Sequence, residues 1–413
     1  MAAPLLGAGD GSLDISLLAG LHPLMTFSRA STATYMRAGT ILSAAAGAPR
    51  FETDVAGNPL GVLSDTQSQN LAVQSVPGAT GWGYFNTSNV PGAAADPSGG
   101  VAAEAVSDTA TNAAHTFYHA NLSFVSGTTY TQSIFVKAGT ASLIQIAFPL
   151  NAFGANAYAN FNISTGTWGT VGSAATALPP VQLANGWWRI GIYATATATI
   201  ATTPQFATIN SPTAANIPSY VGTGSTIYIW GLQVETGVVM TAYIPTSGSA
   251  VTRAADNLSL PLAVLPQLQS GVGYTFAFEC DLQTNTPSNY RAVFGVDDAS
   301  GFTNALYATV LPNGQFAWGG PIASLPNFVL PAVGTVLKTA FSINRGEMQV
   351  QAALNGAIVA PGALSNLPVF TNVGLMQAPP PWGSGATELG GHTRRVRAWP
   401  RVLSAAELAQ VTT

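Results

Sequence analysis

Glu279 and Asp281 are the residues of this sequence whose types and spacing come nearest to catalytic chemistry. They lie two positions apart in an alternating run, and residues with that spacing share one face of a β-strand. Two carboxyl groups on one face could flank a glycosidic bond, and retaining hydrolysis requires such a pair about 5 Å apart. A third carboxylate would strengthen the pattern, but Gln283 stands two positions further on. We therefore expect a polar strand face and no enzyme activity, with glycoside hydrolysis as the alternative.

Other catalytic and metal-binding patterns are weaker. Neither a Gly-x-Ser-x-Gly elbow nor a phosphate-binding Gly-x-x-x-x-Gly-Lys loop occurs. The four histidines have no cysteine or acidic cluster beside them that would complete a zinc site. Asp297 and Asp298 are weak candidates for calcium, which prefers carboxylate and carbonyl oxygens, although both fit ordinary turns. We expect no cofactor, with calcium as the alternative, and a buried Cys280 that acts as a small apolar residue.

Four aromatic residues in loop-like surroundings are candidates for stacking on sugar rings: Trp82, Tyr84, Trp318 and Trp382. A binding site on a β-sandwich combines flat apolar faces with a few polar groups. Trp382 follows three prolines, whose stiff backbone would hold the indole outward. Core packing or contact with another subunit is the alternative for each ring.

A basic cluster near the C-terminus stands out in a chain with only 13 Lys and Arg residues. It comprises Arg394, Arg395 and Arg397, with His392 and Arg401 beside them. The planar guanidinium group suits phosphate and carboxylate, so the cluster could meet an anionic surface polysaccharide. The alternative is a set of ion pairs within the fold or between subunits.

The sequence is poor in charge, with 7% charged residues and 47% hydrophobic residues. A free monomer normally keeps itself in solution with surface charge. We therefore favour an assembly in which partners cover much of the surface, and a neutral hydroxyl-rich surface is the alternative. The formal net charge of -4 predicts no nucleic-acid partner.

The sequence contains no run of 18 apolar residues, which predicts no membrane insertion. The N-terminus has no positively charged start and so makes a poor signal peptide. We expect synthesis in a cytoplasm without a visible export route.

Short β-like runs separated by Gly, Pro, Asn and Ser cover residues 23–255. Residues 129–137 and 187–193 alternate with the period of half-buried strands, whereas 226–235 is apolar on both faces, as in a central strand. We interpret 192–218 as long loops. These features predict a β-sandwich.

A second module is expected over residues 256–413. Residues 274–282 alternate between apolar positions, which should face the core, and outward positions such as Glu279 and Asp281. Asn355-Gly356 is a hairpin-turn signal, and Ser404 with Glu407 forms a capping box that should open a short helix. The fold class is therefore all-β: two consecutive jelly-roll sandwiches after an N-terminal arm over 1–22, with a short C-terminal helix.

Two separated stretches carry a resemblance to a known family. They contain Thr26-Phe27-Ser28-Arg29-Ala30-Ser31, Pro49-Arg50-Phe51, Asn70-Leu71, Trp187-Trp188-Arg189, Trp230-Gly231-Leu232-Gln233-Val234-Glu235, Tyr243-Ile244-Pro245-Thr246 and Arg253-Ala254-Ala255-Asp256. As a set, they resemble tailed-phage virion proteins of the head-spike and tail-fibre type, with a carbohydrate-binding-module-like domain over 23–255. Members often have an acidic and then a basic residue before the asparagine, where this sequence has Ser64 to Gln69. That departure weakens the ion pair that the resemblance implies there.

The C-terminal region is similar to concanavalin-A-like, laminin-G-type domains over residues 270–411. The similarity rests on the run 337–342, the Asn355-Gly356 turn and the Leu-Ser-x-x-Glu-Leu helix from Leu403 to Leu408. It implies a lectin-type sandwich over 256–413.

Together the resemblances imply a virion-surface protein, a head spike or fibre that binds host surface polysaccharide for attachment. We expect a homo-oligomer, a trimer first and a pentamer second, with residues 1–22 anchored to capsid or tail proteins. A polysaccharide depolymerase is one alternative, and a capsid decoration or assembly protein without a ligand is the other.

Overall fold

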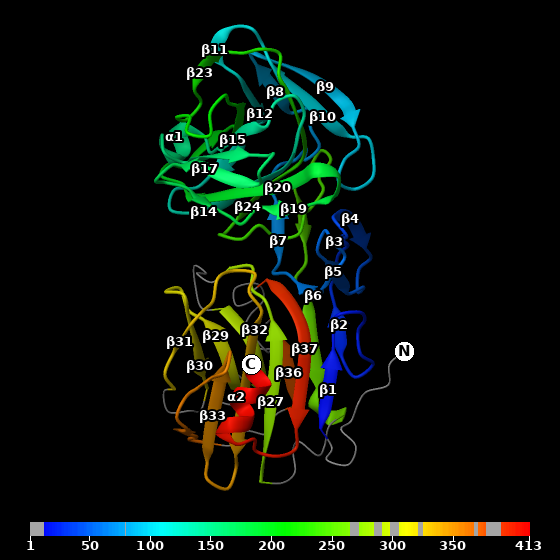
Figure 1. The fold of residues 1–413 in the computed structure, drawn as a ribbon, viewed down its shortest axis with the longest axis vertical. Coiled ribbons are helices and arrows are strands. Elements are labelled where there is room, and N and C mark those ends of the chain that lie inside the picture. The colour runs from blue at the N-terminus through cyan, green and yellow to red at the C-terminus, as the bar shows by residue number, and fades with distance from the viewer. Residues whose placement is uncertain are drawn as a thin grey trace.

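The computed structural model describes residues 12–78, 80–264, 272–284, 291–297, 305–320, 325–366, 371–376 and 390–413. They form two antiparallel β-sandwiches stacked end to end, with a narrower joint between them (Figure 1). The expected all-β sandwich class and the short C-terminal helix are therefore confirmed.

The upper sandwich in Figure 1 packs a seven-stranded sheet on a six-stranded sheet. The seven-stranded sheet runs in the order β18 (Thr176–Ala177), β20 (Trp187–Thr195), β14 (Thr129–Ala138), β24 (Thr226–Thr236), β10 (Ala103–Asp108) and β9 (Thr87–Ala94), and β19 (Val181–Gln182) also pairs with β20. The six-stranded sheet runs β17 (Thr167–Val171), β16 (Tyr158–Asn162), β15 (Leu143–Ala147), β22 (Gln205–Thr208), β12 (Thr116–His119) and β8 (Trp82–Phe85).

Smaller elements complete this sandwich. They are the pairs β11 (Asn112–Ala114) with β23 (Ser219–Val221) and β13 (Leu122–Phe124) with β21 (Ile200–Thr202), and the helix α1 (Leu150–Phe153). The expected central strand is confirmed, because β24 lies between β14 and β10. The expectation of long loops over 192–218 was wrong in part, since β22 pairs with both β12 and β15. The apolar run of β22 is short and is flanked by Pro and Asn, so the sequence did not indicate a strand in the interior of a sheet.

The lower sandwich also has two sheets. The nine-stranded sheet runs β34 (Ala357–Ile358), β33 (Gln349–Leu354), β32 (Leu337–Asn344), β27 (Gly273–Cys280), β37 (Gly391–Trp399), β6 (Pro59–Ser64) and β5 (Arg50–Thr53), with β1 (Leu13–Ser16) on β37 and β35 (Gly362–Ala363) on β33. The seven-stranded sheet runs β2 (Thr26–Ser28), β26 (Asn257–Pro261), β36 (Asn372–Leu375), β28 (Arg291–Asp297), β29 (Ala305–Val310), β30 (Gln315–Gly319) and β31 (Phe328–Val329).

The core of the lower sandwich follows the alternation of β27. Phe276, Phe278 and Cys280 point inward and are buried, as the sequence predicts. The opposite face is not solvated, because α2 (Ala405–Thr412) covers it: Ala277 packs with Leu408 of this helix. The capping box is confirmed, since Ser404 caps α2 together with Glu407. The predicted hairpin turn at 355–356 is confirmed between β33 and β34.

The N-terminal segments are placed differently from the expected division at residues 22 and 255. Residues 13–16 form β1, which pairs with β37, so this part of the expected arm is a strand of the lower sandwich. Strands β2, β5 and β6 also join sheets of the lower sandwich, although they precede the upper sandwich in sequence. Residues 1–11 of the arm lie outside the described part of the chain. Each segment is too short to reveal its partner, because strand pairing is a long-range choice.

The joint contains two small antiparallel pairs, β3 (Ala33–Arg37) with β4 (Thr40–Ala44) and β7 (Ser68–Asn70) with β25 (Val251–Arg253). The chain passes through the joint twice, once on the way into the upper sandwich and once on the way out (Figure 1). The chain before the upper sandwich therefore pairs there with the chain after it, through β7 and β25.

Candidate functional site

A buried cluster of five charged residues holds the joint together. Arg50 forms ion pairs with Asp65, at 2.9 Å, and with Asp256. Arg29 donates to Asp256 at 3.0 Å, and Arg253 lies 3.7 Å from Asp65. The side chains of all five are at most 1% exposed. The residues come from segments far apart in sequence, so the cluster ties the chain before the upper sandwich to the chain after it.

The charges in the cluster stabilise one another. Burial favours the protonated form of Asp65, but the positive charges of Arg253 and Arg50 overcome it and hold the pKa well below its ordinary value. Gln283 of the lower sandwich donates to Asp65 at 3.1 Å. The departure from the family pattern after Gly61 was expected to weaken an ion pair there. In the structure Asp65 of this segment forms an ion pair with Arg50.

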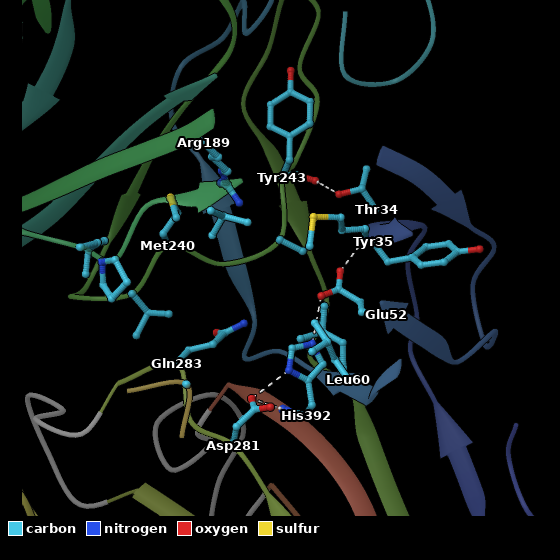
Figure 2. A pocket seen from close by; sticks show the side chains of 18 of the residues that line it. Thr34, Tyr35, Glu52, Leu60, Arg189, Met240, Tyr243, Asp281, Gln283 and His392 are labelled. Atoms are coloured by element: carbon cyan, nitrogen blue, oxygen red, sulfur yellow. Dashed lines mark hydrogen bonds and ion pairs between the residues drawn. The ribbon is translucent and has the colours of Figure 1, made fainter. Parts of the chain in front are cut away.

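A cavity of about 280 Å³ lies beside this cluster (Figure 2). Its walls come from the joint, the upper sandwich and the lower sandwich. Most of the lining is apolar: Met36, Ile41, Leu60, Leu63, Phe135, Leu178, Pro179, Val181, Leu183, Val239, Met240, Ala242, Tyr243, Leu282 and Val333. Cavities of this kind, apolar with a few polar groups, are the usual form of small-molecule sites.

His392 marks the lower edge of the cavity and bridges two carboxylates (Figure 2). Its Nδ1 lies 2.8 Å from Asp281 Oδ1, and its Nε2 lies 3.0 Å from Glu52 Oε2. Burial disfavours the imidazolium, but the two carboxylates outweigh it and raise the pKa of His392 to about 10. Burial likewise opposes ionisation of Asp281, yet His392 and Arg394 lower its pKa. The group is therefore a structural ion-pair bridge between β37, β5 and the end of β27.

Arg189 reaches the cavity from the upper sandwich and is 7% exposed. Its guanidinium donates to the carbonyl oxygen of Thr241 at 2.7 Å and to the hydroxyl of Ser133 at 3.1 Å. It also lies 5.3 Å from the ring centre of Phe135. Its Nε has no hydrogen-bond partner, and no carboxylate oxygen of the described residues lies within ion-pair distance. Burial therefore lowers its pKa, which Glu235 and Asp65 only partly offset from further away.

The basic cluster proposed to meet polysaccharide is engaged in ion pairs within the fold. Arg394 donates to Asp281 at 2.9 Å, Arg397 lies 3.2 Å from Glu279, and Arg395 forms a pair with Asp14. The alternative interpretation, an ion-pair set within the fold, is what the structure shows, although Arg395 remains 41% exposed. The two carboxylates considered for glycoside hydrolysis are thus each held by cations.

The candidate aromatic residues do not converge on one surface. Trp318 is 6% exposed and packs against Phe316 and Phe341 in the core of the lower sandwich, so its assignment as a ligand residue was wrong. Trp82 and Tyr84 lie on β8 and face the core of the upper sandwich, where both are half-buried. The Trp82 indole donates to the carbonyl oxygen of Gln74 at 3.0 Å, and the Tyr84 hydroxyl donates to Glu104 at 2.7 Å.

Some candidates lie beyond what the structure describes. Trp382 and Asp298 fall outside the described residues, and Asp297 ends β28 with a side chain that is not described. Among the described residues, no group of three or more His, Cys, Asp or Glu could hold a metal ion. None of the described helices combines the length and apolar character needed to cross a membrane.

An aromatic pair that sequence reasoning missed, the exposed Phe85 and the half-buried Tyr118, lies on the outer face of the six-stranded sheet. Because Trp82 and Tyr84 face the core, Gly83 and Phe85 of β8 face outward. Phe85 is 58% exposed. Tyr118 of β12 pairs with Gly83, and its ring lies over this glycine, so closely that a Cβ there would come within 2.4 Å of it. Strict alternation along Trp82–Phe85 is the signal that could have found this face.

Comparisons with protein-family models and with curated proteins find no match. Among solved structures, the carbohydrate-binding module CBM40 of a Ruminococcus gnavus IT-sialidase, bound to α2,3-sialyllactose, is 16% identical. The alignment covers 36% of this chain and 87% of that chain, with a TM-score of 0.28.

Two further solved structures are similar to parts of the chain. The NanB sialidase of Streptococcus pneumoniae is 15% identical over 37% of this chain and 26% of its own, with a TM-score of 0.28. A heptameric pentraxin of Limulus polyphemus is 9% identical over 34% of this chain and 70% of its own, with a TM-score of 0.25.

Proposed function

We propose that this chain is a non-catalytic, glycan-binding structural component of a virion surface, the head-spike or tail-fibre type that its sequence resembles. The observation that carries the proposal is the neutral surface of the upper sandwich. In this role the upper sandwich contacts host polysaccharide and other copies of the chain, and the joint fixes it to the lower sandwich.

Residues 72–250 contain only six charged side chains. Five of them are buried, namely Asp96, Glu104, Asp108, Arg189 and Glu235. Lys137, which is half-buried, is the sixth. The described surface of this sandwich therefore presents Thr, Ser, Asn, Ala and Gly almost without charge. Such a surface suits hydroxyl-rich glycans and contact between copies, because a charge-free surface does not repel another copy of itself.

The aromatic pair Phe85 and Tyr118 offers a place for a sugar ring. The two side chains lie on one face, at neighbouring same-face positions of β8 and β12. Gln205 on β22 faces Tyr118 in the next strand pair. An apolar platform beside amide and hydroxyl groups is the combination that saccharide binding requires.

The ion pairs of Glu279 and Asp281 favour a binding role over a depolymerase. A general acid must hold a proton near neutral pH, whereas the cations beside Asp281 lower its pKa. A carboxylate that already accepts hydrogen bonds from His392 and Arg394 is also poorly placed to attack a sugar carbon.

Glycan-array binding by the wild type, Phe85→Ala and Val329→Ala tests the proposal. Val329 is 84% exposed on β31 of the lower sandwich and serves as the matched control for loss of an exposed apolar side chain. We expect the wild type and the control to bind the same glycans, and Phe85→Ala to lose most of that binding. Absence of any glycan binding by the wild type contradicts the proposal and favours a decoration or assembly protein without a ligand.

The assembly part of the proposal has its own test. Light scattering coupled to size exclusion should give an oligomer of the wild type, a trimer first and a pentamer second. A monomer at all concentrations would contradict the proposed assembly. The glycan array would still test the proposed glycan binding.

A further inference from the structure

The cavity at the joint is a site that the proposed glycan binding does not use. It lies between the sandwiches, away from the outer face that carries Phe85, and its lining is dominated by aliphatic side chains. Saccharides need several hydrogen-bonding partners, whereas most polar groups of these walls, such as Thr34, Glu52 and His392, already have partners within the protein. The occupant must therefore be mainly apolar.

Arg189 indicates which polar group that ligand should carry. It extends from β20 toward the open space of the cavity (Figure 2). More than nine-tenths of this residue is removed from solvent, and its Nε has no partner. A buried cation without a contacting anion is costly, and a ligand carboxylate would remove that cost by forming charge-assisted hydrogen bonds.

The other charged groups on the lining are already paired. Glu52 accepts from the backbone amide of Met36 at 2.6 Å and contacts His392, which in turn contacts Asp281. A ligand ammonium group would therefore have to compete with an existing imidazolium for either carboxylate. A ligand anion competes with nothing at Arg189 except two neutral oxygens and the Phe135 ring.

The charge balance of the joint points the same way. Apart from the exposed Arg37 of β3, its described cations are Arg29, Arg50, Arg189, Arg253, His392 and Arg394, and the carboxylates beside them are Glu52, Asp65, Glu235, Asp256 and Asp281. One positive charge is left over, in a chain whose formal net charge is -4. Since every other cation of this set has a carboxylate within ion-pair distance, the unpaired one is Arg189.

We propose that the cavity binds an aliphatic monocarboxylate, with its carboxylate on Arg189 and its hydrocarbon chain among Leu183, Met240 and the other apolar walls. Exposed lining residues such as Pro179 and Gly334 mark where the cavity meets solvent. A molecule wedged there contacts both sandwiches, so binding also braces the joint.

Titration calorimetry with octanoate as the probe, and octanol as the uncharged control, tests the inference. We expect the wild type to bind octanoate and to bind octanol at least about tenfold more weakly, since hydrogen bonds to charged groups contribute about 1.5–3 kcal/mol. Arg189→Met should weaken octanoate by about tenfold to a hundredfold. Lys137→Met removes the other cation of residues 72–250 and should leave binding unchanged.

A second variant keeps the test decisive if Arg189→Met does not fold. Val239→Phe places a larger side chain on a half-buried lining residue and should abolish octanoate binding. Val329→Phe makes the same substitution at an exposed position of β31 and should bind like the wild type. The inference is overturned if the wild type fails to bind octanoate, if octanol binds as tightly, or if Val239→Phe binds as well as Val329→Phe. Glycan binding should be the same in Val239→Phe and the wild type, which separates this result from the fate of the proposed function.

Discussion

Arg50 and Asp256 form an ion pair across 206 positions of sequence, and neither side chain is exposed. Arg50 opens β5 of the nine-stranded sheet, and Asp256 immediately precedes β26 of the seven-stranded sheet. The pair therefore joins the two sheets of the lower sandwich at the end that faces the joint. Asp65 extends the network toward the upper sandwich, because the backbone amide of Ala242 donates to it at 3.4 Å.

Removal of one partner from this cluster should be severely destabilising. Arg50→Met leaves Asp65 and Asp256 buried with fewer cations, and breaking a buried pair in this way costs about 3–5 kcal/mol. Urea unfolding followed by circular dichroism measures the loss. Arg37→Met, at an exposed arginine of β3, should change the free energy of unfolding by less than about 0.5 kcal/mol. Equal effects of the two substitutions would contradict a structural role for the cluster.

The bridge made by His392 should give the protein a pH-dependent stability. The folded-state pKa of about 10 is above the ordinary histidine value of 6.5, so the imidazolium stabilises the fold. This contribution is complete below about pH 6.5 and is lost as the pH rises toward 10. We expect the difference in Tm between the wild type and His392→Gln to be largest near pH 6 and to shrink toward pH 10. A difference that grows with pH would refute the assignment.

The more deeply an ion pair is buried, the more its removal should lower the free energy of unfolding. Asp281 is 8% exposed and contacts two cations, whereas Asp14 is 35% exposed and pairs with the exposed Arg395. Asp281→Asn should therefore lower the free energy of unfolding by about 3 kcal/mol, and Asp14→Asn by less than about 1 kcal/mol.

Assays for reducing ends released from bacterial capsule should find no activity in the wild type. Release that disappears in Asp281→Asn and Glu279→Gln would instead establish the depolymerase.

Strand β1 should contribute to the stability of the lower sandwich. Ile15 is 1% exposed and belongs to its core, so Ile15→Ala should cost about 2–5 kcal/mol. Ser16 on the same strand is exposed, and Ser16→Ala should change stability by less than about 0.5 kcal/mol. Denaturant titrations compare the two. A negligible effect of Ile15→Ala would mean that residues 13–16 act as a free arm.

Cys280 should report on the unfolding of the lower sandwich. It is fully buried, and burial, together with the nearby Asp281 carboxylate, raises the pKa of its thiol. A thiol reagent should therefore leave the folded protein unmodified and react completely in denaturant. Rapid modification of the folded protein would contradict the burial of this residue.

Local patterns in the sequence were enough to predict several strands and the C-terminal helix. The alternation over 274–282 gave the inward positions of β27, and Ser404 with Glu407 gave the start of α2, because both depend on neighbours within a few residues. The apolar character of 226–235 gave a central strand for the same reason. The burial of the outer face of β27 was missed, because the helix that covers it lies about 130 positions away.

Which distant segments contact one another could not be predicted from these patterns. The sequence singled out Arg29, Arg50, Arg253 and Asp256 within the motifs that carry the resemblance, but only the tertiary structure assembled them around Asp65 in one buried cluster. It also decided that Trp318 packs in a core and that Phe85, not Trp82 or Tyr84, faces outward. The physical reason is that a period-two pattern shows that a strand has two faces. Which face becomes buried, and beside which strand, depends on contacts made across the whole chain.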